Sequence, residues 1–378
     1  MMFCPQFRPV VGGAERQAEK LARALAGLGC QVLILTPRID SESPTFEECD
    51  GVRIERFPVT DLSRRWPIPG IGLVSGPYIV WQVARAVLRR VTGFDVVHCH
   101  IASLQVAGAA LAARLARVPV VCKAAIAAER SDLGEMERTG LGGRVGAWLV
   151  RRLIPSWIAT TQAVQHGLVR AGVQPQQITL IPNGVDSSRN DARAFPGLGV
   201  TRFLYLGRLS TNIQRDVPTL IQSFDRLAAH HSAVELALVG GGDLLEKTPA
   251  LAAACAAATR IVVPGFDKPE PWLAWCDCFV LPSRKEGLSN ALLEAMAAGL
   301  PCIANDIPPN REVLADGTAG ILVPVGDADR LVEAMNKMVT DPAHANAYGR
   351  AAAKRVTEQY TIDSVARQCT VLYDALQR

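Results

Sequence analysis

Short apolar runs alternate with helical periods along the first half of the chain. The apolar runs, rich in β-branched residues, are 31–36, 95–99, 119–123, 157–161 and 178–182. Between them, segments such as 13–29 and 104–118 carry apolar residues at helical spacing. Strands that are apolar on both faces and separated by helices are typical of a parallel sheet covered on both sides. This half therefore predicts a doubly wound α/β domain.

The pattern lapses at 183–201 and then starts again. This segment is polar, aperiodic and rich in turn residues, as expected of a linker. After it, apolar runs return at 203–207, 234–240, 260–265, 278–282 and 301–304. We therefore expect two doubly wound, Rossmann-like parallel-sheet domains, 1–185 and 186–360, that face a cleft. A last helix within 361–378 is expected to pack back across the domain boundary.

The first domain begins with an unusually short apolar segment. Only residues 1–7 are available as a strand before the Gly12-Gly13 turn. The first strand is therefore either very short or part of a longer sequence, and the residues leave both open.

Composition narrows the class of protein. With 378 residues, 49% of them hydrophobic, the chain is globular and long enough for two domains. A net charge of +4 does not favour nucleic-acid binding. The ten cysteines include no C-x-x-C pair, and no secretory signal opens the chain. Prolines, glycines and polar residues interrupt its longest uncharged stretches. We expect a cytoplasmic protein with reduced thiols, at most peripheral at the inner face of a membrane.

The segment with the most candidate functional residues is 282–301, PSRKEGLSNALLEAMAAGLP. It predicts a strand end, a polar turn and a helix that begins near Ser289 or Asn290. Helix N-termini expose N–H groups and a partial positive charge that bind phosphate. Glu286 lies in the turn and Glu294 inside the helix, so the two acids can flank a ligand at the helix start. The residues alone also fit a solvated helix acid and a partner of the helix dipole.

This segment resembles the E-x7-E motif of retaining GT-B glycosyltransferases of family 4. GGAERQ (12–17), IPNGVD (181–186), LGRLS (206–210) and LVGGGD (238–243) follow the order of that family. The resemblance covers essentially the whole chain and implies the GT-B fold. It also implies transfer of a sugar, with retention of anomeric configuration, from a UDP- or GDP-sugar to a saccharide or lipid-linked hydroxyl. Cell-envelope or exopolysaccharide synthesis is the process that such enzymes suggest.

The resemblance assigns catalytic roles to three residues. Glu286 would lie beside the donor sugar, and Arg208 would neutralise the leaving diphosphate. The family usually places a lysine shortly after that arginine, whereas here alignment on the next helix brings Arg215 to the lysine position. Arginine also clamps phosphate, through a planar fork of donors. Two cations would stabilise the charge that develops on the leaving group.

Donor binding is assigned by the same resemblance. Glu294 would hold the ribose, and glycines near the N-terminus would let the backbone approach the diphosphate. The expected donor-binding residues are Gly12, Gly13, Gly265, Gly287, Leu288, Ser289, Asn290 and Glu294. A plain turn before a helix is the alternative interpretation of Gly12 and Gly13.

One family feature is missing from the first domain. Many members carry a histidine after the strand equivalent to 119–123, where this chain has Lys123. His100, at the end of the preceding strand, could approach the acceptor or sugar site, although a structural histidine is the more common outcome. Lys123, or Ser131 with Asp132, could shape that site instead.

No metal is required by this interpretation. Asp327 and Asp329 form a D-x-D sequence, but they are better explained as the N-cap and a first-turn acid of a helix. Neither GxGxxG nor a P-loop occurs, which disfavours dehydrogenases and ATPases.

Segment 64–91 combines arginines, Trp66, Tyr78 and Trp81 with an apolar helical face. That combination suits contact with an anionic membrane, and an ordinary covering helix with a solvated arginine stripe is the alternative. Residues 1–183 hold 21 Lys+Arg and 14 Asp+Glu, a net charge of +7, whereas the remainder carries −3. The resemblance implies that domain 1–185 binds the acceptor and domain 186–360 the nucleotide sugar, so the basic half is the one expected to meet the acceptor.

Two other functions stay open from the sequence. A GT-B nucleotide-sugar epimerase would share the fold, and a catalytically inactive protein could bind nucleotide sugars. The ordered motifs disfavour the epimerase, and the Glu286/Glu294 pair with Arg208 disfavours the inactive protein.

Overall fold

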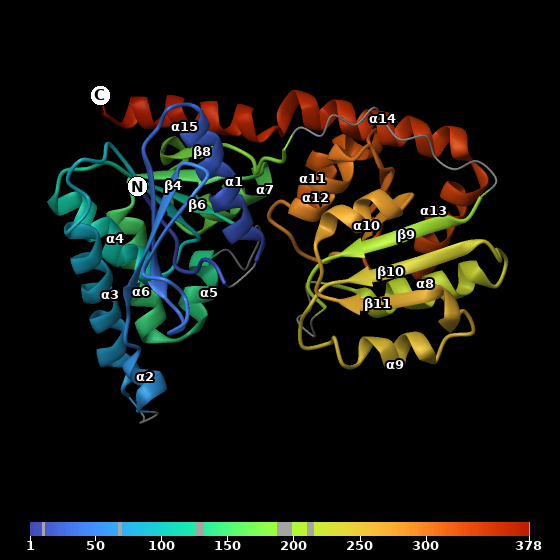
Figure 1. Ribbon diagram of the computed structural model, residues 1–378, viewed down its shortest axis with the longest axis horizontal. Coiled ribbons are helices and arrows are strands. Elements are labelled where there is room, and N and C mark those ends of the chain that lie inside the picture. Colours follow the sequence, from blue (N-terminus) through green and yellow to red (C-terminus); the bar gives the residue numbers. More distant parts are fainter. Residues whose placement is uncertain (10–11, 67–69, 126–131, 187–198, 210–214, 378) are drawn as a thin grey trace. The chain divides into compact units, whose positions relative to one another are not determined.

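The computed structural model describes residues 1–9, 12–66, 70–125, 132–186, 199–209 and 215–377. The chain forms two compact units. Unit 1 comprises Met1–Gly184 together with Ile362–Arg378, and unit 2 comprises Val185–Thr361 (Figure 1). Unit 1 is therefore discontinuous in sequence, because it contains the last helix.

Unit 1 is built on an eight-stranded sheet, here called sheet A, in the order β3-β4-β2-β1-β5-β6-β7-β8. Its strands are β1 (Met2–Phe3), β2 (Val32–Arg38), β3 (Phe46–Cys49), β4 (Val52–Pro58), β5 (Val97–His100), β6 (Val120–Ala124), β7 (Ser156–Ala159) and β8 (Ile178–Leu180). All pairs are parallel except β3–β4, an antiparallel hairpin at the edge. The first strand is very short, and both of its residues are buried.

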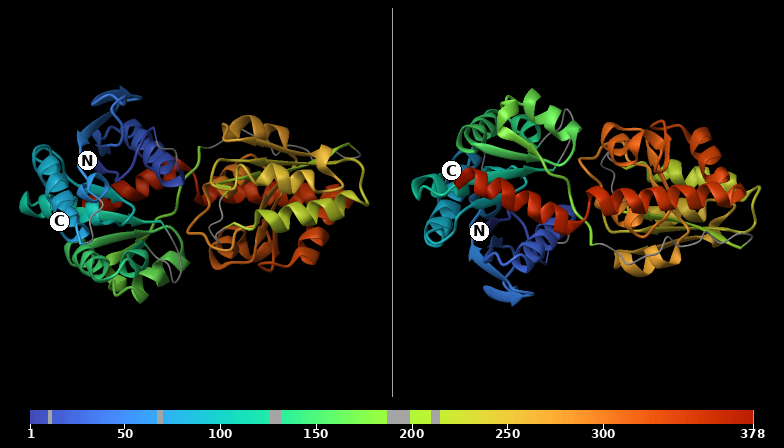
Figure 2. Two further views of the ribbon diagram at one scale, coloured as in Figure 1. Left: turned by 90° about the horizontal axis from the view of Figure 1, so that it is seen from below. Right: turned by 90° about the horizontal axis from the view of Figure 1, so that it is seen from above.

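Helices cover both faces of sheet A. The helices of unit 1 are α1 (Gly13–Gly27), α2 (Leu62–Arg65), α3 (Gly72–Leu88), α4 (Leu104–Leu115), α5 (Asp132–Arg138), α6 (Leu141–Leu153), α7 (Gln162–Arg170) and α15 (Ile362–Gln377), with a 3₁₀ turn at Pro175–Gln177. Helices α3, α4 and α6 share one apolar core. Helices α1 and α15 lie side by side on the opposite face, around a second core (Figure 2).

Unit 2 contains a six-stranded, wholly parallel sheet, here called sheet C, in the order β11-β10-β9-β12-β13-β14. Its strands are β9 (Thr201–Leu206), β10 (Val234–Val239), β11 (Ile261–Gly265), β12 (Cys278–Leu281), β13 (Cys302–Asn305) and β14 (Ile321–Val323). Its helices are α8 (Val217–Ala228), α9 (Thr248–Ala253), α10 (Pro269–Trp275), α11 (Asn290–Ala297), α12 (Pro308–Val313), α13 (Ala328–Thr340) and α14 (Pro342–Gln359), with 3₁₀ turns at Ala258–Arg260 and Ala315–Gly317. Two apolar cores lie on its two faces.

The expectation of doubly wound α/β units is thus confirmed. All ten cysteines lie in the described part of the chain, and none forms a disulfide. Within the described residues, no helix is both long and apolar enough to cross a membrane.

Candidate functional site

The turn between β12 and α11 forms the carboxyl edge of sheet C. Helix α11 begins at Asn290, and the hydroxyl of its N-cap Ser289 accepts a hydrogen bond from the Leu292 amide at 3.4 Å. The predicted helix start is therefore confirmed. Because parallel sheets bind ligands beyond the carboxyl ends of their strands, this turn lies where a donor is expected.

Three side chains form a closed cluster in this turn. The Arg215 guanidinium forms an ion pair with Glu286 and donates to the Ser283 hydroxyl. Ser283 in turn donates to Glu286 Oε1 at 3.0 Å. The Arg215 and Glu286 side chains are only 19% and 11% exposed, and Ser283 is fully buried. Two residues predicted from the sequence are thus brought together by a third that was not.

Backbone and side-chain contacts hold Arg215 in place. Arg215 forms an isolated antiparallel β-bridge with Ser283, and the Asp216 amide donates to the Pro282 carbonyl at 2.8 Å. Asp216 also accepts hydrogen bonds from Arg284, at 3.1 Å from Nε and 2.5 Å from Nη2. The segment before α8 is therefore fastened to the segment after β12, which fixes the Arg215–Glu286 pair.

Arg208 lies near this cluster at the carboxyl end of β9. Its side chain is exposed, and its carbonyl accepts a hydrogen bond from the Tyr205 hydroxyl at 2.9 Å. Burial lowers the pKa of Arg215, and the neighbouring charge of Arg208 acts in the same direction. Burial also raises the pKa of Tyr205 to about 12. The two guanidinium groups repel each other, and a bound dianion would offset this repulsion.

Glycines allow the neighbouring strand ends to approach closely. Gly240 has φ +156°, and a Cβ there would collide with the Gly207 carbonyl. Gly242 has φ +145°, and its missing Cβ leaves room for the Leu209 carbonyl. Gly265, a predicted donor-binding residue, has φ +86°, and its carbonyl accepts a hydrogen bond from the Gly240 amide at 2.8 Å. These glycines keep the carboxyl edge of sheet C compact beside Arg208.

The remaining predicted residues of unit 2 lie along the turn and α11. Gly287, Leu288 and Ser289 are buried, and the Leu288 side chain belongs to the apolar core, so only its backbone is suited to a ligand. Asn290 and Glu294 are half-buried and four positions apart, which puts them on one helix face.

Phe266 is a candidate that sequence reasoning missed. It follows Gly265, its side chain is 61% exposed, and its Cβ would lie 3.5 Å from a Cβ placed on Gly241. An exposed aromatic ring beside a glycine loop offers a flat apolar surface at this edge. The signal in the sequence was an aromatic residue directly after a strand that ends in Gly.

The predicted glycine turn of unit 1 opens α1. Gly12 is the N-cap and has extended backbone, with φ −131°. A Cβ on Gly12 would meet only the carboxylate of Glu15, which reaches back over the helix start. Gly13 is the first residue of the helix. The start of α1 thus combines an N-cap glycine with the acidic side chain of Glu15 in the first turn, whose negative charge interacts favourably with the helix dipole.

Gln17 joins two of the family motifs. Its side chain is buried, donates to the Gly184 carbonyl at 2.8 Å and accepts the Gly184 amide at 3.1 Å. Gln17 ends GGAERQ and Gly184 lies in IPNGVD, so the two motifs meet within unit 1. Gln17 was not predicted as a site residue from the sequence, although it belongs to the GGAERQ motif.

His100 and Lys123 are brought together as neighbours on β5 and β6. Both are buried, and the His100 ring stacks on His98 with centroids 4.4 Å apart. Burial, with the nearby Lys123 charge, lowers the pKa of His100 to about 3, and burial lowers the pKa of Lys123 to about 8. His98 Nδ1 lies 2.6 Å from the Tyr373 hydroxyl of α15. Ser131 lies outside the described residues, and the Asp132 side chain is not described.

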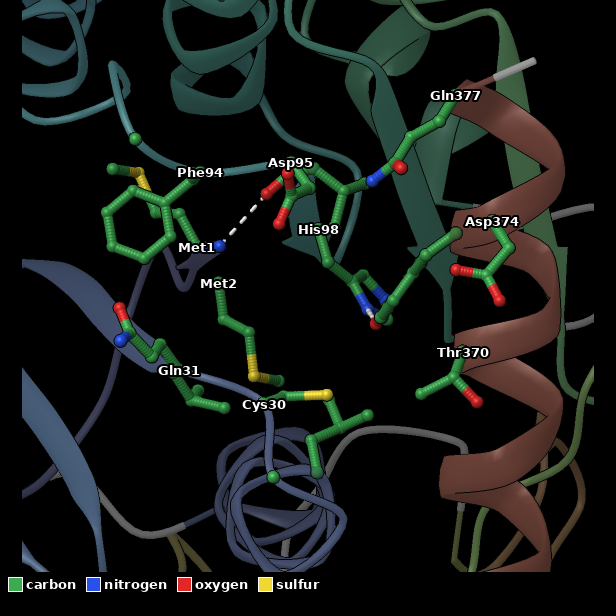
Figure 3. Close-up of a pocket in the computed structure, with 16 residues that line it drawn as sticks. Met1, Met2, Cys30, Gln31, Phe94, Asp95, His98, Thr370, Asp374 and Gln377 are labelled. Carbon is green, nitrogen blue, oxygen red and sulfur yellow. Dashed lines mark hydrogen bonds between the residues drawn. The ribbon is translucent and has the colours of Figure 1, made fainter.

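A separate cavity of about 350 Å³ lies at the amino ends of the central strands of sheet A (Figure 3). His98, Asp95, Cys30 and Asp374 are among the residues that line it. It lies at the edge opposite to that at which parallel sheets bind ligands, and we assign it no function.

The D-x-D sequence has a structural role. Asp327 is the N-cap of α13 and accepts the Arg330 amide at 3.0 Å. Asp329, in the first turn, pairs with Arg226 at 2.7 Å. Across the described ranges, no cluster of three or more His, Cys, Asp or Glu side chains is arranged to hold a metal ion.

Two family models match the chain. Glycosyltransferase Family 4 matches residues 11–189, and Glycosyl transferases group 1 matches residues 200–341. Together they include most of both units. The expected family is therefore confirmed.

Curated relatives match over nearly their full length. Glycogen synthase of Mycobacterium tuberculosis is 29% identical, with 100% of this chain and 95% of the relative covered. Phosphatidyl-myo-inositol mannosyltransferase of Mycobacterium leprae is 28% identical, with 99% and 96% covered.

Solved structures show the same fold. Sucrose-phosphate synthase of Thermosynechococcus elongatus has a TM-score of 0.74 at 21% identity, with 99% and 98% of the two chains covered. HepE of Anabaena, in complex with UDP and glucose, has a TM-score of 0.76 at 18% identity, with 99% of both chains covered. At this identity the likeness establishes the GT-B fold alone.

Proposed function

Because the chain belongs to glycosyltransferase family 4, we propose that it transfers a sugar from a UDP- or GDP-sugar to a hydroxyl of a saccharide or lipid-linked acceptor, with retention of anomeric configuration. Unit 2 binds the donor in this proposal, and unit 1 binds the acceptor. A role in cell-envelope or exopolysaccharide synthesis follows as the finer part of the proposal.

One observation carries the proposal: the Arg215–Ser283–Glu286 cluster at the carboxyl edge of sheet C. An arginine that is largely buried and fixed through both backbone and side chain is already oriented before a ligand arrives. Preorganised groups that stabilise the charge developing in the transition state usually make the largest single contribution to catalysis. Arg208, exposed beside the cluster, supplies the second cation.

The proposed reaction is a front-face displacement. The acceptor oxygen forms a bond to the anomeric carbon as the bond from that carbon to the diphosphate oxygen breaks. The proton of the acceptor hydroxyl passes to the departing phosphate, and a nucleoside diphosphate is released. Arg208 and Arg215 stabilise its charge, while Glu286 positions the donor sugar and stabilises its positive character.

Donor recognition uses the rest of the edge. In the proposal Glu294 and Asn290 hold the ribose from one face of α11, and the backbone of residues 287–289 approaches the sugar or the diphosphate. Gly265 with Phe266 borders the nucleobase, and Gly12 with Gly13 contributes from unit 1. His100 and Lys123 are proposed for the acceptor or sugar site.

No metal is included in the proposal, because two arginines supply the positive charge at the leaving group. Transfer should then persist in the presence of a chelator. Loss of transfer on chelation, restored by a divalent cation, would contradict this part.

The alternatives are an epimerase and an inactive nucleotide-sugar-binding protein. An epimerase would interconvert nucleotide sugars without an acceptor, and an inactive protein would bind them without consuming any. The family models favour a transferase over an epimerase, and the buried Arg215–Glu286 pair favours chemistry over binding alone.

The decisive experiment measures nucleoside diphosphate released from a panel of UDP- and GDP-sugars with saccharide and lipid acceptors. We expect acceptor-dependent release, and at least a hundredfold lower turnover for Glu286→Gln, roughly the loss seen when one transition-state contact is removed. Nucleotide binding by Glu286→Gln should be largely retained in calorimetry. A panel without donor consumption, or a fully active Glu286→Gln, would overturn the proposal.

A further inference from the structure

Two helices of unit 1 expose continuous stripes of apolar and arginine side chains. On α3, Val74, Tyr78, Trp81 and Arg85 follow helical spacing, and all four are exposed. On α6 the exposed stripe is Leu141, Arg144, Val145, Trp148 and Arg152. The buried residues of both helices face the same apolar core, so both stripes lie on the outer side of one face of sheet A. Helix α4 packs against both α3 and α6.

Tryptophans distinguish these stripes from an ordinary solvated helix face. Trp66, Trp81 and Trp148 are 48%, 52% and 57% exposed, whereas Trp157 in the core is fully buried. Two of the six tryptophans, Trp81 and Trp148, therefore lie on the two stripes. Leu141 at 76% exposed and Val74 at 58% add to it. Large apolar side chains gathered on one surface mark an interaction site, and tryptophan and tyrosine are enriched at membrane interfaces.

The charged side chains of the α3 and α6 stripes are all arginines, whereas α5, which packs against α6, carries Glu135 and Glu137. Residues 62–128 contain eight Lys or Arg and a single acid, Asp95, and residues 139–185 contain four arginines and no acid. Among the described residues, none of Arg85, Arg89 and Arg144 forms an ion pair with a carboxylate. These charges are therefore available to an external anion.

The arginines and the rings are already combined. The Arg65 guanidinium lies 5.3 Å from the centre of the Trp66 ring, and that of Arg85 lies 5.6 Å from the Trp81 ring. Trp81 also stacks on Tyr78, with centroids 5.7 Å apart. Rings at the level of the headgroups with guanidinium groups beside them suit a lipid interface.

We propose that this arginine–aromatic surface, formed by the exposed stripes of α3 and α6, binds the surface of an anionic lipid bilayer. The aromatic and aliphatic side chains enter the headgroup region, and the arginines pair with lipid phosphates. The inference goes beyond the proposed function, because it holds whatever sugar or acceptor the enzyme uses. Its test requires neither donor nor acceptor.

The test is flotation of the full chain with vesicles of phosphatidylcholine, with and without phosphatidylglycerol. We expect binding to the anionic vesicles and much weaker binding to the neutral ones. Because each arginine near a charged surface is worth about a fivefold change in partitioning, Arg85→Gln/Arg89→Gln should lower the partition coefficient about 25-fold. Raising ionic strength from about 0.1 M to 1 M, which shortens screening from about 10 Å to 3 Å, should also release the protein.

Tryptophan variants separate apolar insertion from charge alone. Trp81→Ser/Trp148→Ser should lower partitioning by about tenfold or more. The matched control is Arg367→Gln/Val371→Ser on α15, which removes an exposed arginine and a 69% exposed valine from the opposite face of unit 1. This control should bind as the wild type does. Near-ultraviolet circular dichroism confirms that each variant is folded.

Three results would overturn the proposal. The folded protein fails to float with anionic vesicles, or the α15 control loses as much binding as the α3 and α6 variants. Alternatively, the chain self-associates through this surface in sedimentation and binds no vesicles. Failure of the transfer assay would leave the flotation result unaffected.

Discussion

The carboxyl edges of the two sheets both hold buried basic side chains, but these differ in whether a carboxylate lies beside them. At sheet C, Arg215 is buried together with the carboxylate of Glu286 and keeps its charge. At sheet A, His100 and Lys123 are buried and, within the described residues, have no carboxylate partner. Burial lowers the pKa of His100 to about 3 and that of Lys123 to about 8. Burial lowers the pKa of both Arg215 and His100, but the Glu286 carboxylate lies beside Arg215, whereas the buried His100 imidazole is neutral near pH 7. The paired Arg215 of unit 2 is the group that we propose for the diphosphate.

Among the substitutions that test this comparison, the one at Arg215 is expected to have the largest effect on turnover. Arg215→Met should lower turnover about 10²–10³-fold, because it removes a preorganised cation and leaves Glu286 buried without its partner. Steady-state kinetics with the donor identified in the release assay measures the change.

Arg226→Met is the matched control for that experiment. Arg226 also pairs with an acid, Asp329, but both side chains are largely exposed, at 53% and 78%. A surface pair contributes little, so this variant should keep nearly full turnover. Equal losses in the two variants would show that Arg215 acts through general stability.

A smaller effect concerns acid stability of unit 1. The pKa of His100 is about 3 in the folded protein and near 6.5 when unfolded, so the unfolded chain binds more protons between these values. Stability should therefore fall as the pH drops from 6.5 toward 3, by on the order of 1 kcal/mol per pH unit from this residue. Calorimetry of His100→Gln should show a shallower loss.

His166→Gln provides the comparison, because His166 is exposed on α7. That variant should lose stability in acid as the wild type does. If His100→Gln and His166→Gln behave alike, the buried imidazole is not the source of the acid sensitivity.

The smallest expected effect is at Gly12. Gly12→Ala should change the free energy of unfolding by less than about 0.5 kcal/mol, because the backbone is extended and only the flexible Glu15 side chain must move. If Gly12 approaches the donor diphosphate, KM for the donor should rise without a change in Tm. Gly240→Ala should instead destabilise the fold by about 1–3 kcal/mol, since its Cβ would meet a backbone carbonyl. An unchanged donor KM in Gly12→Ala would remove Gly12 from the donor site.

The strands could be predicted where they are apolar on both faces. All ten predicted runs form strands, from β2 through β13 with the exception of β3 and β4. The β3–β4 hairpin was missed because FEEC and VRIERFP carry charged residues among the apolar ones, unlike a strand that is buried on both faces. Its turn was nonetheless marked by Asp50-Gly51, where both residues have positive φ.

The contacts between residues of the site were harder to predict from the sequence than the residues themselves. Glu286 and Arg215 were both named from the sequence, but the contact between them depends on how the segment before α8 meets the end of β12. Ser283 carries no signal of its own in PSRKEG, because a serine after a strand usually opens a turn. His100 and Lys123 are adjacent because their strands pair in parallel register, a long-range property.

The position of α15 has a consequence for synthesis of the protein. Unit 2 occupies an uninterrupted stretch, Val185–Thr361, and has all of its core residues once that stretch has been made. Unit 1 lacks Ile362, Val365, Ala366 and Cys369 of its second core until the ribosome has translated the whole of unit 2. The half of the protein that is made first is therefore completed last, and a nascent chain must keep that apolar face of sheet A from aggregating in the meantime.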